Sequence, residues 1–225
     1  GYSLLAELQA VDTQRRITTR GRQMAALPLD PRLAAMLLAA QEKHCLREVL
    51  IIASALSVQE PRDRPTDKKQ QADEKHKQWA DDRSDLVSYL RLWQAFEVQR
   101  QTLSGSALRK YCEKNFLSWQ RMREWRDVHH QLSVSCQQQK LKINHDEQDY
   151  TALPPALYAG LHQALMTGLL SNIAQRQEDK EYLGCRQRKL KIFPGSVQVK
   201  KAPRWLMAAN LMETSQLFAH GVAMI

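Results

Sequence analysis

A block of basic residues at positions 182–204 carries the side chains best suited to bind a charged ligand. It contains no Asp or Glu and seven cations, which are Arg186, Arg188, Lys189, Lys191, Lys200, Lys201 and Arg204. The whole chain has 33 Lys and Arg against 24 Asp and Glu, so the block holds seven of the nine net positive charges. Because solvated surfaces normally mix both signs, the block favours a polyanionic partner over a basic patch without function.

Apolar residues alternate with cations within this block, and Pro194 and Gly195 interrupt the alternation. The pattern predicts a strand, a turn and a second strand. Alternate residues of a strand share a face, so we expect basic ridges made by Arg186 with Arg188, or by Lys189 with Lys191. Backbone amides at Gly195 and Ser196 would add an anion contact in the turn. The next strand would be flanked by Lys200, Lys201 and Arg204.

One string suggests ATP chemistry but has a simpler interpretation. Residues 73–76 read DEKH, the D-E-x-H pattern that binds Mg²⁺ at the end of a buried strand in nucleic-acid-dependent ATPases. Here the string lies inside the polar run KKQQADEKHKQW, and the chain has no GxxxxGK[ST] motif to hold phosphates. We therefore interpret the string as part of a solvated helix and expect neither a bound cofactor nor ATP hydrolysis by this segment alone.

Other patterns give no catalytic or metal-binding residues. His129 and His130 are adjacent, so on a helix their side chains point about 100° apart, and no Cys or carboxylate is spaced to complete a metal site. The SGS turn at residues 104–106 lacks the strand-to-helix context of a nucleophile elbow. The four cysteines show no metal-binding spacing and favour free thiols in a reducing cytoplasm. No run of roughly 18–20 apolar residues is present, and the N-terminus does not resemble a signal peptide, so we expect a cytoplasmic segment without a membrane partner.

The first two thirds of the chain predict helices. After Asp30 and Pro31, which are typical of a helix start, the apolar residues recur with the i, i+3, i+4, i+7 spacing of a buried face. Residues 45–58 are apolar nearly all round and predict the central helix of a bundle. Further helices are expected at residues 3–10, 18–27, 84–100, 107–116 and 117–132, and residues 67–80 predict a solvated helix or a mobile arm. One face of 117–132 carries Arg121, Arg123 and Arg126, which could contact phosphates, although a plain solvated face is the simpler interpretation.

The last third changes from helical to strand periodicity. Residues 137–155 are polar, end in two prolines and form the best candidate for a domain boundary. After one more helix at 156–168 come the short β-prone runs LLSNIA, YLG, KLKIF, SVQV, WLMAANLM and LFAHGVAMI. About five short strands in so compact a segment predict a small antiparallel barrel. The predicted fold class is therefore α+β, a mainly α-helical bundle followed by this barrel.

Four groups of motifs, taken in order, carry a family resemblance: TTRGRQMAALPLDPRLAAMLLAA, ALSVQEPRDRP, FLSWQRMREWRDVHHQL, and YLGCRQRKLKIFPGS followed by KAPRWLMAANLMETSQLF. Together they resemble the C-terminal accessory region of DEAH-box RNA helicases, most closely the bacterial HrpA type, over essentially the whole chain. The resemblance implies three domains. Residues 1–29 would be the end of a degenerate winged-helix domain, 30–145 a helical ratchet (helicase-associated) bundle, and 146–225 an OB-fold domain. Asn210 and the FPGS turn at 193–196 depart from the family's usual acid and His-Pro turn.

The resemblance also implies a function. The segment would be an accessory part of an ATP-dependent RNA helicase, an NTP hydrolase whose RecA-like domains, lying outside this segment, bind ATP and Mg. Single-stranded RNA would pass along a channel lined by the ratchet bundle and the barrel, and the RecA-like domains of the same protein would be the second partner. The residues expected to contact nucleic acid are Arg186, Arg188, Lys189, Lys191, Ser196, Lys200, Lys201 and Arg204, with Arg123 and Arg126 as lesser contributors. Phosphate contacts do not distinguish RNA from DNA, so both stay open.

A function of another class stays open as well. The barrel could be a protein-docking module that recruits a cofactor protein or a ribosomal partner. This alternative predicts an exposed apolar patch beside the basic ridge, involving Trp205 and Phe218.

Overall fold

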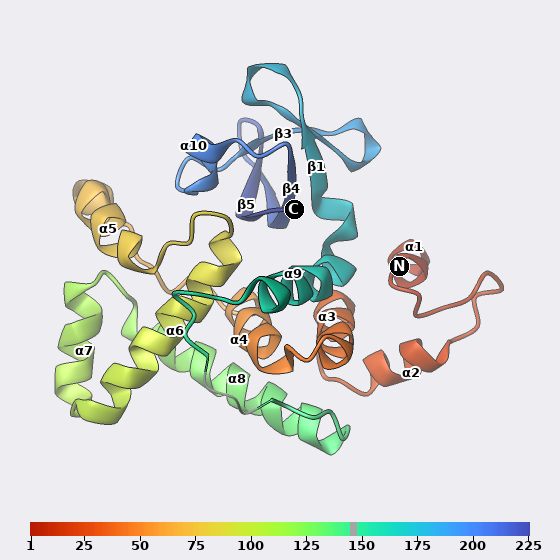
Figure 1. The fold of residues 1–225 in the computed structure, drawn as a ribbon, viewed down its shortest axis with the longest axis horizontal. Coiled ribbons are helices and arrows are strands. Elements are labelled where there is room, and N and C mark those ends of the chain that lie inside the picture. The colour runs from red at the N-terminus through yellow and green to blue at the C-terminus, as the bar shows by residue number, and fades with distance from the viewer. Residues whose placement is uncertain (145–147) are drawn as a thin grey trace.

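The computed structural model describes residues 1–144 and 148–225. In these residues a group of helices occupies one side of the molecule, and a closed five-stranded barrel is seated on it (Figure 1). This arrangement confirms the predicted α+β class. The predicted domain boundary between residues 145 and 146 lies outside the described residues, and the three-domain division stays a prediction.

Helices fill the chain before the barrel. They are α1 (Tyr2–Glu7), α2 (Thr19–Ala25), α3 (Pro31–Glu42), α4 (Leu46–Leu56), α5 (Lys69–His76), α6 (Asp85–Thr102), α7 (Gly105–Lys114), α8 (Trp119–Gln138) and α9 (Pro155–Leu169). Side-chain caps fix several of their starts, because a helix leaves its first amides without partners. Asp30 accepts the Arg32 amide at 2.9 Å, and Ser84 and Ser118 cap α6 and α8 in the same way.

The helix predicted to be central is α4, and its burial confirms that prediction. Its residues from Val49 to Ala55 are all buried. Trp125 of α8 is fully buried against it, and the indole Nε1–H donates to the carbonyl of Ile51 and to Ser54 Oγ, each at 3.0 Å. This pairing satisfies the one polar atom of a large side chain that would otherwise be costly to bury.

Both ends of the helical part contribute to one hydrophobic core. Leu8 and Met24 from the N-terminal helices, and Leu161 and Leu165 from α9, belong to the same buried cluster as α3 and α4. At the crossing of α9 over α3, a Cβ on Gly168 would lie only 2.5 Å from the Arg32 carbonyl oxygen. The two helices can approach this closely because residue 168 has no side chain.

The charged segment at residues 67–80 forms a helix rather than a free arm. Here α5 lies between two 3₁₀ turns, Thr66–Lys68 and Lys77–Trp79, and Trp79 is buried. The DEKH string therefore lies on a helix, as expected. Asp73 forms an ion pair with Arg64 at 2.6 Å, and His76 Nε2 lies 3.0 Å from the Phe116 carbonyl oxygen.

The barrel consists of β1 (Ile173–Arg176), β2 (Tyr182–Gly184), β3 (Lys189–Ile192), β4 (Trp205–Glu213) and β5 (Leu217–Met224). It closes in the order β1-β2-β3-β5-β4, with β3 and β5 parallel and the other pairs antiparallel. Its own core includes Ala174, Tyr182, Leu190, Ile192, Leu206, Ala208, Leu217, Ala219 and Val222. Gly221 has a φ of +64°, a conformation that glycine adopts without strain, and a Cβ there would lie 2.8 Å from Ala209 Cβ.

One predicted strand is wrong. The SVQV run at residues 196–199 leads into a short helix, α10 (Gln198–Lys201), which lies beside the barrel on the side that faces α5 (Figure 1). The Ser196 amide donates to the Phe193 carbonyl, and Ser196 Oγ accepts the Gln198 amide at 3.1 Å. These bonds start a helical turn directly after Pro194 and Gly195. The burial of Gln198 in the folded protein then outweighs the strand preference of Val197 and Val199.

Three cysteines (Cys45, Cys112 and Cys136) are buried and Cys185 is exposed, and all four are free thiols. Across residues 1–144 and 148–225, no cluster of His, Cys, Asp and Glu is arranged to hold a metal ion. None of the helices in those ranges has the length and apolar character that crossing a membrane requires.

The Trp125 contacts predict a large stability loss on Trp125→Phe. The substitution removes both indole hydrogen bonds and leaves space in a closely packed core, so we expect unfolding to become easier by about 2–3 kcal/mol. Urea denaturation followed by far-UV circular dichroism measures this. Trp205→Phe is the matched control, because Trp205 is 42% exposed and should change stability little. Equal urea midpoints for the two variants would contradict the prediction.

Candidate nucleic-acid interface

The loop between β2 and β3 carries two of the predicted contact residues, Arg186 and Arg188. Residues Cys185–Gln187 form a 3₁₀ turn in which Arg186 and Gln187 have φ values of 58° and 59°. Arg186 is therefore on a turn and not on a strand, so the predicted strand ridge of Arg186 and Arg188 is wrong in its geometry. Both side chains are nevertheless exposed, on a loop at the edge of the barrel.

These two arginines meet a third one at a cavity of about 530 Å³. Arg32 from the first turn of α3 lines the same cavity, which also touches α1 and the 3₁₀ turn Leu170–Asn172. We call the site of Arg32, Arg186 and Arg188 the arginine cleft. Glu7 is the acidic residue that lines it. In Figure 1, α1 lies next to the segment that joins α9 to β1.

Arg32 was not among the residues predicted from the sequence. It lies directly before the apolar residues of α3, outside the basic block at residues 182–204. Arg32 lies close to the barrel because α3 and α9 cross closely at Gly168. No local sequence pattern reveals this crossing.

The predicted ridge of Lys189 and Lys191 does form on β3. Leu190 and Ile192 belong to the barrel core, so the two lysines between and before them face outward. Lys189 Nζ lies 3.8 Å from a carboxylate oxygen of Glu181 and is 78% exposed, so this contact is a weak surface pair.

The other cations of the block lie on α10 and just before β4. Lys200, Lys201 and Arg204 are exposed, as expected for contact residues. Lys201 Nζ is 3.6 Å from Asp82 Oδ2, so it also contacts the helical part. Ser196 is used within the fold, because its amide donates to Phe193 and its hydroxyl hydrogen-bonds the Asp85 carboxylate.

The structure does not bring the arginines of α8 to the basic block. The helix α8 lies on the opposite side of the bundle from the barrel (Figure 1). Arg126 is paired with Glu97 at 2.7 Å and Arg121 with Asp63 at 2.8 Å. Arg123 is exposed and lines a separate cavity of about 680 Å³ together with Arg109 and Trp119.

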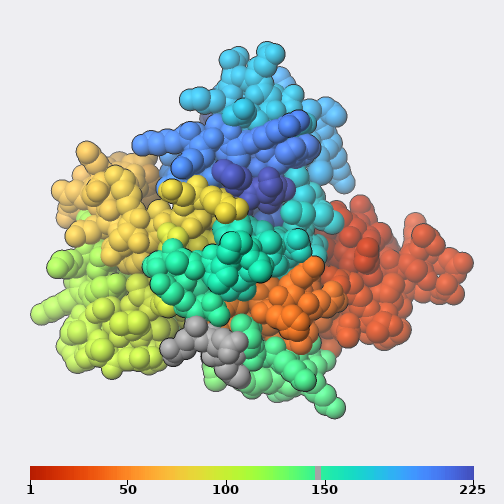
Figure 2. Space-filling model, in the orientation of Figure 1, coloured from red at the N-terminus to blue at the C-terminus, as the bar shows by residue number. Residues whose placement is uncertain are grey.

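A short stretch that leads into α6, residues 82–85, joins the helical part to the barrel, and we call it the junction segment. Its backbone extends the barrel, since the Met224 amide donates to the Arg83 carbonyl at 2.8 Å and Ser84 pairs with Ala223. The Gln198 side-chain amide donates to the Asp82 carbonyl at 3.1 Å. In the space-filling view this part of the chain (yellow) lies directly against the barrel (blue) (Figure 2).

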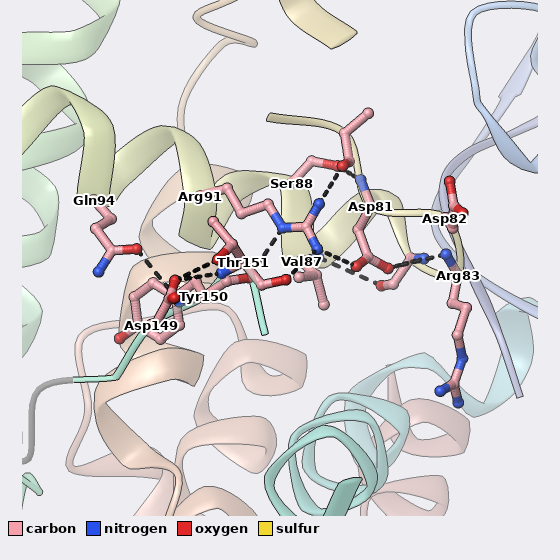
Figure 3. Close-up of polar contacts among 12 residues, drawn as sticks. Asp81, Asp82, Arg83, Val87, Ser88, Arg91, Gln94, Asp149, Tyr150 and Thr151 are labelled. Atoms are coloured by element: carbon pink, nitrogen blue, oxygen red, sulfur yellow. Dashed lines mark hydrogen bonds and ion pairs between the residues drawn. The ribbon is translucent and has the colours of Figure 1, made fainter. Parts of the chain in front are cut away.

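Asp81 and Arg91 hold the junction segment in place. Arg91 Nη2 donates to Asp81 Oδ2 at 2.7 Å, while Asp81 Oδ1 accepts the amides of Arg83 and Ser84 at 2.9 and 3.0 Å (Figure 3). Arg91 Nε also donates to the Tyr150 carbonyl at 2.9 Å. The guanidinium thus connects α6, the junction segment and the stretch before α9.

Asp85 connects the junction to the basic block. Its Oδ2 accepts the Val222 amide at 2.9 Å, and the carboxylate also accepts the Ser196 hydroxyl. Burial raises the pKa of Asp85, and these two hydrogen bonds oppose the rise only in part. A carboxyl with a raised pKa therefore lies between the bundle, β5 and the turn that precedes α10.

A serine–histidine contact that the sequence did not reveal lies at the same junction. His162 Nδ1 is 2.8 Å from the Tyr158 carbonyl oxygen, so it carries the proton, and Nε2 accepts the Ser84 hydroxyl at 2.8 Å. Burial lowers the pKa of His162. Both residues are buried, and Ser84 also accepts the Val87 amide, so this pair fixes the start of α6 and offers no access to a substrate.

Glu60 forms a second polar cluster close by, with Arg62 and Tyr89. Its carboxylate accepts Arg62 Nε at 2.7 Å, Arg62 Nη2 at 2.9 Å and the Tyr89 hydroxyl at 2.7 Å. Burial alone would raise the pKa of Glu60, but the Arg62 charge and these hydrogen bonds lower it to about 2. The cluster therefore stabilises the fold above the unfolded pKa of Glu60 and loses this contribution as the pH falls towards 2.

Comparison with known proteins confirms the resemblance. Residues 30–89 match the family described as "Helicase associated domain (HA2), ratchet-like", and residues 161–225 match the family described as "Oligonucleotide/oligosaccharide-binding (OB)-fold". The chain is 43% identical over its whole length to an "ATP-dependent RNA helicase HrpA homolog" of Haemophilus influenzae and to "ATP-dependent RNA helicase HrpA" of Escherichia coli. It is 26% identical, over 98% of its length, to the "Pre-mRNA-splicing factor ATP-dependent RNA helicase prp22" of Schizosaccharomyces pombe. The chain spans 17–18% of the length of these relatives.

The raised pKa of Asp85 predicts that Asp85→Asn increases stability near pH 7 but not near pH 4. For a carboxyl whose pKa is raised by folding, the favourable contribution is present at low pH and is lost as the pH rises through that pKa. Asparagine resembles the protonated acid and can keep both hydrogen bonds. We expect the thermal midpoint of the variant to exceed that of the parent protein by about 2–4 °C at pH 7, the equivalent of ~1 kcal/mol.

Thermal denaturation across pH 4–7 measures this, and Asp82→Asn is the control, because the Asp82 side chain is 87% exposed. A shift for Asp85→Asn that stays constant over this pH range would show that the carboxyl is not titrating as described.

Proposed function

Because the chain matches the C-terminal region of HrpA-type ATP-dependent RNA helicases along its whole length, we propose that it is the nucleic-acid-binding accessory part of such a helicase. In this proposal single-stranded RNA is held through its phosphates. RecA-like domains of the same protein bind ATP and Mg and perform the hydrolysis. The chain's own residues contribute no ATPase motif and act by holding the strand.

The observation that carries the proposal is the arginine cleft. Three arginine residues from two separate parts of the fold line one cavity, and Arg is suited to phosphate because its planar fork can donate two parallel hydrogen bonds. The cavity volume of about 530 Å³ lies in the range of natural ligand sites. Lys189, Lys191 and Lys200 extend the positive surface along the barrel.

The protein-docking alternative predicted one exposed apolar patch with Trp205 and Phe218. Phe218 pairs with Met212 on β4, seven residues beyond Trp205, which corresponds to roughly 23 Å along the strand. The two aromatic residues therefore do not share a patch, and no observation favours that function over nucleic-acid binding.

Charge reversal in the cleft provides the first test. We expect Arg186→Glu with Arg188→Glu to weaken the binding of a labelled single-stranded RNA about 10-fold or more at low salt. The slope of log affinity against log salt should decrease by about 1.4, because each lost phosphate contact on a single strand contributes about 0.7. Fluorescence anisotropy across a salt series measures both quantities.

Lys110→Glu with Lys114→Glu is the matched control. It makes the same change in charge at two exposed lysines of α7, far from the barrel (Figure 1). Equal losses for the two double variants would mean that only net charge matters and would reject the cleft as the binding site.

Arg32→Glu tests the geometry of the cleft directly. Arg32 lies far from the basic block in the sequence but lines the same cavity, so we expect this single change to decrease the salt slope by about 0.7. Anisotropy under the same conditions gives the result. An unchanged slope would separate Arg32 from the phosphate contacts.

A further inference from the structure

The barrel carries a group of aromatic and polar side chains that the proposed phosphate contacts at the arginine cleft do not use. The group consists of Lys191, Phe193, Asn210, Met212, Phe218 and His220, and we call it the outer aromatic face. None of the six residues is buried, and Met212 is 52% exposed.

The strand register places these side chains on one face. Met212 pairs with Phe218 and Asn210 with His220 across β4 and β5, and side chains directly opposite in such pairs lie on the same side of a sheet. Phe218 also pairs with Lys191 across β3 and β5. The alternate residues Leu190, Ile192, Leu217 and Ala219 fill the barrel core, so the face points outward.

The aromatic rings of this face contact one another. Phe193 stacks on His220 with ring centroids 4.1 Å apart at 26°, and it meets Phe218 edge-on at 6.3 Å and 90°. Arg64 lies over Phe193 at 5.9 Å and is itself paired with Asp73. Phe193 thus contacts His220, Phe218 and Arg64, whereas Phe218 is partly exposed and pairs with Met212 and Lys191, its neighbours on the adjacent strands.

We propose that the outer aromatic face is a stacking site for an unpaired base of a single-stranded nucleic acid, centred on Phe218. The proposal rests on the proposed function, because it assumes that the same strand is held by its phosphates nearby. Aromatic side chains stack on bases of any sequence, and a neighbouring cation can hold the adjoining phosphate. Lys191, which pairs directly with Phe218, is that cation here and the one cation among the six residues.

A nucleic acid fits this face better than a protein partner does. Stable protein interfaces bury roughly 1,200–2,000 Å². The apolar surface here comes from a few side chains on three short strands. One aromatic ring with a flanking cation and an amide at Asn210 suffices for a single base.

The experiment compares two labelled single strands of equal length and backbone charge, an oligouridylate and an oligonucleotide of abasic sites. Binding of each to the full chain is measured by anisotropy over a salt series. We expect the parent protein to prefer the base-bearing strand, and Phe218→Leu to weaken its binding about 5- to 20-fold while leaving abasic binding and the salt slope unchanged. Phe218→Leu keeps an apolar side chain of similar volume, and its thermal midpoint verifies that the barrel stays folded.

Trp205→Leu is the matched control, since it removes an exposed aromatic ring elsewhere on the same barrel. It should leave the preference for the base-bearing strand intact. The parent protein could bind both strands in a salt-dependent way while Phe218→Leu weakens binding to both equally or to neither. This result would reject the stacking site but not the proposed function, and a protein partner would then be the ligand of the face. If the parent protein binds neither strand in a salt-dependent way, the proposed function itself fails.

Discussion

The ion pair between Arg91 and Asp81 is the interaction on which the relation between bundle and barrel depends. Asp81 uses one oxygen for the guanidinium and the other for the amides of Arg83 and Ser84, so the pair fixes the backbone of the junction segment. That backbone in turn pairs with β5. The two side chains are only 18% and 14% exposed. Removing one partner of a buried ion pair typically costs about 3–5 kcal/mol, because the other charge is left without compensation. Such a pair enforces a geometry more than it adds stability.

The distribution of charge follows from this junction. Its acids are used inside the molecule, Asp81 by Arg91, Asp85 by Val222 and Ser196, and Asp82 in part by Lys201. By contrast, none of the ion pairs formed among residues 1–144 and 148–225 involves the three cleft arginines. Three acids of the junction thus have partners within the fold, whereas Arg186 and Arg188 are exposed. The attachment of the barrel therefore engages the acids of the junction, and the basic block itself contains no acid.

The sequence predicts those features that depend on local rules. Asp30 with Pro31, and Ser84, mark helix starts, the apolar residues of α4 indicate a central helix, and strand alternation puts Lys189 and Lys191 outside the barrel. The sequence does not predict features that depend on tertiary contacts. The SVQV run is helical because Ser196 starts a turn and Gln198 is drawn to Asp82. Arg186 lies on a 3₁₀ turn, and Arg32 reaches the barrel only through the crossing of α3 and α9. The sequence thus predicted two of the three arginines of the candidate site but not Arg32.

The cleft, more than the exposed lysines, should determine affinity for a polyanion. A surface lysine such as Lys189 is screened by water and salt, and an ion pair there is worth at most about 1 kcal/mol. Three arginines line the cleft, and a phosphate bound there could contact more than one of them. Each such contact would be a charge-assisted hydrogen bond, which is roughly twice as strong as one between neutral groups. In the proposed function these contacts are made to the backbone and not to the bases, so the same cleft would hold each successive nucleotide of a strand equally well.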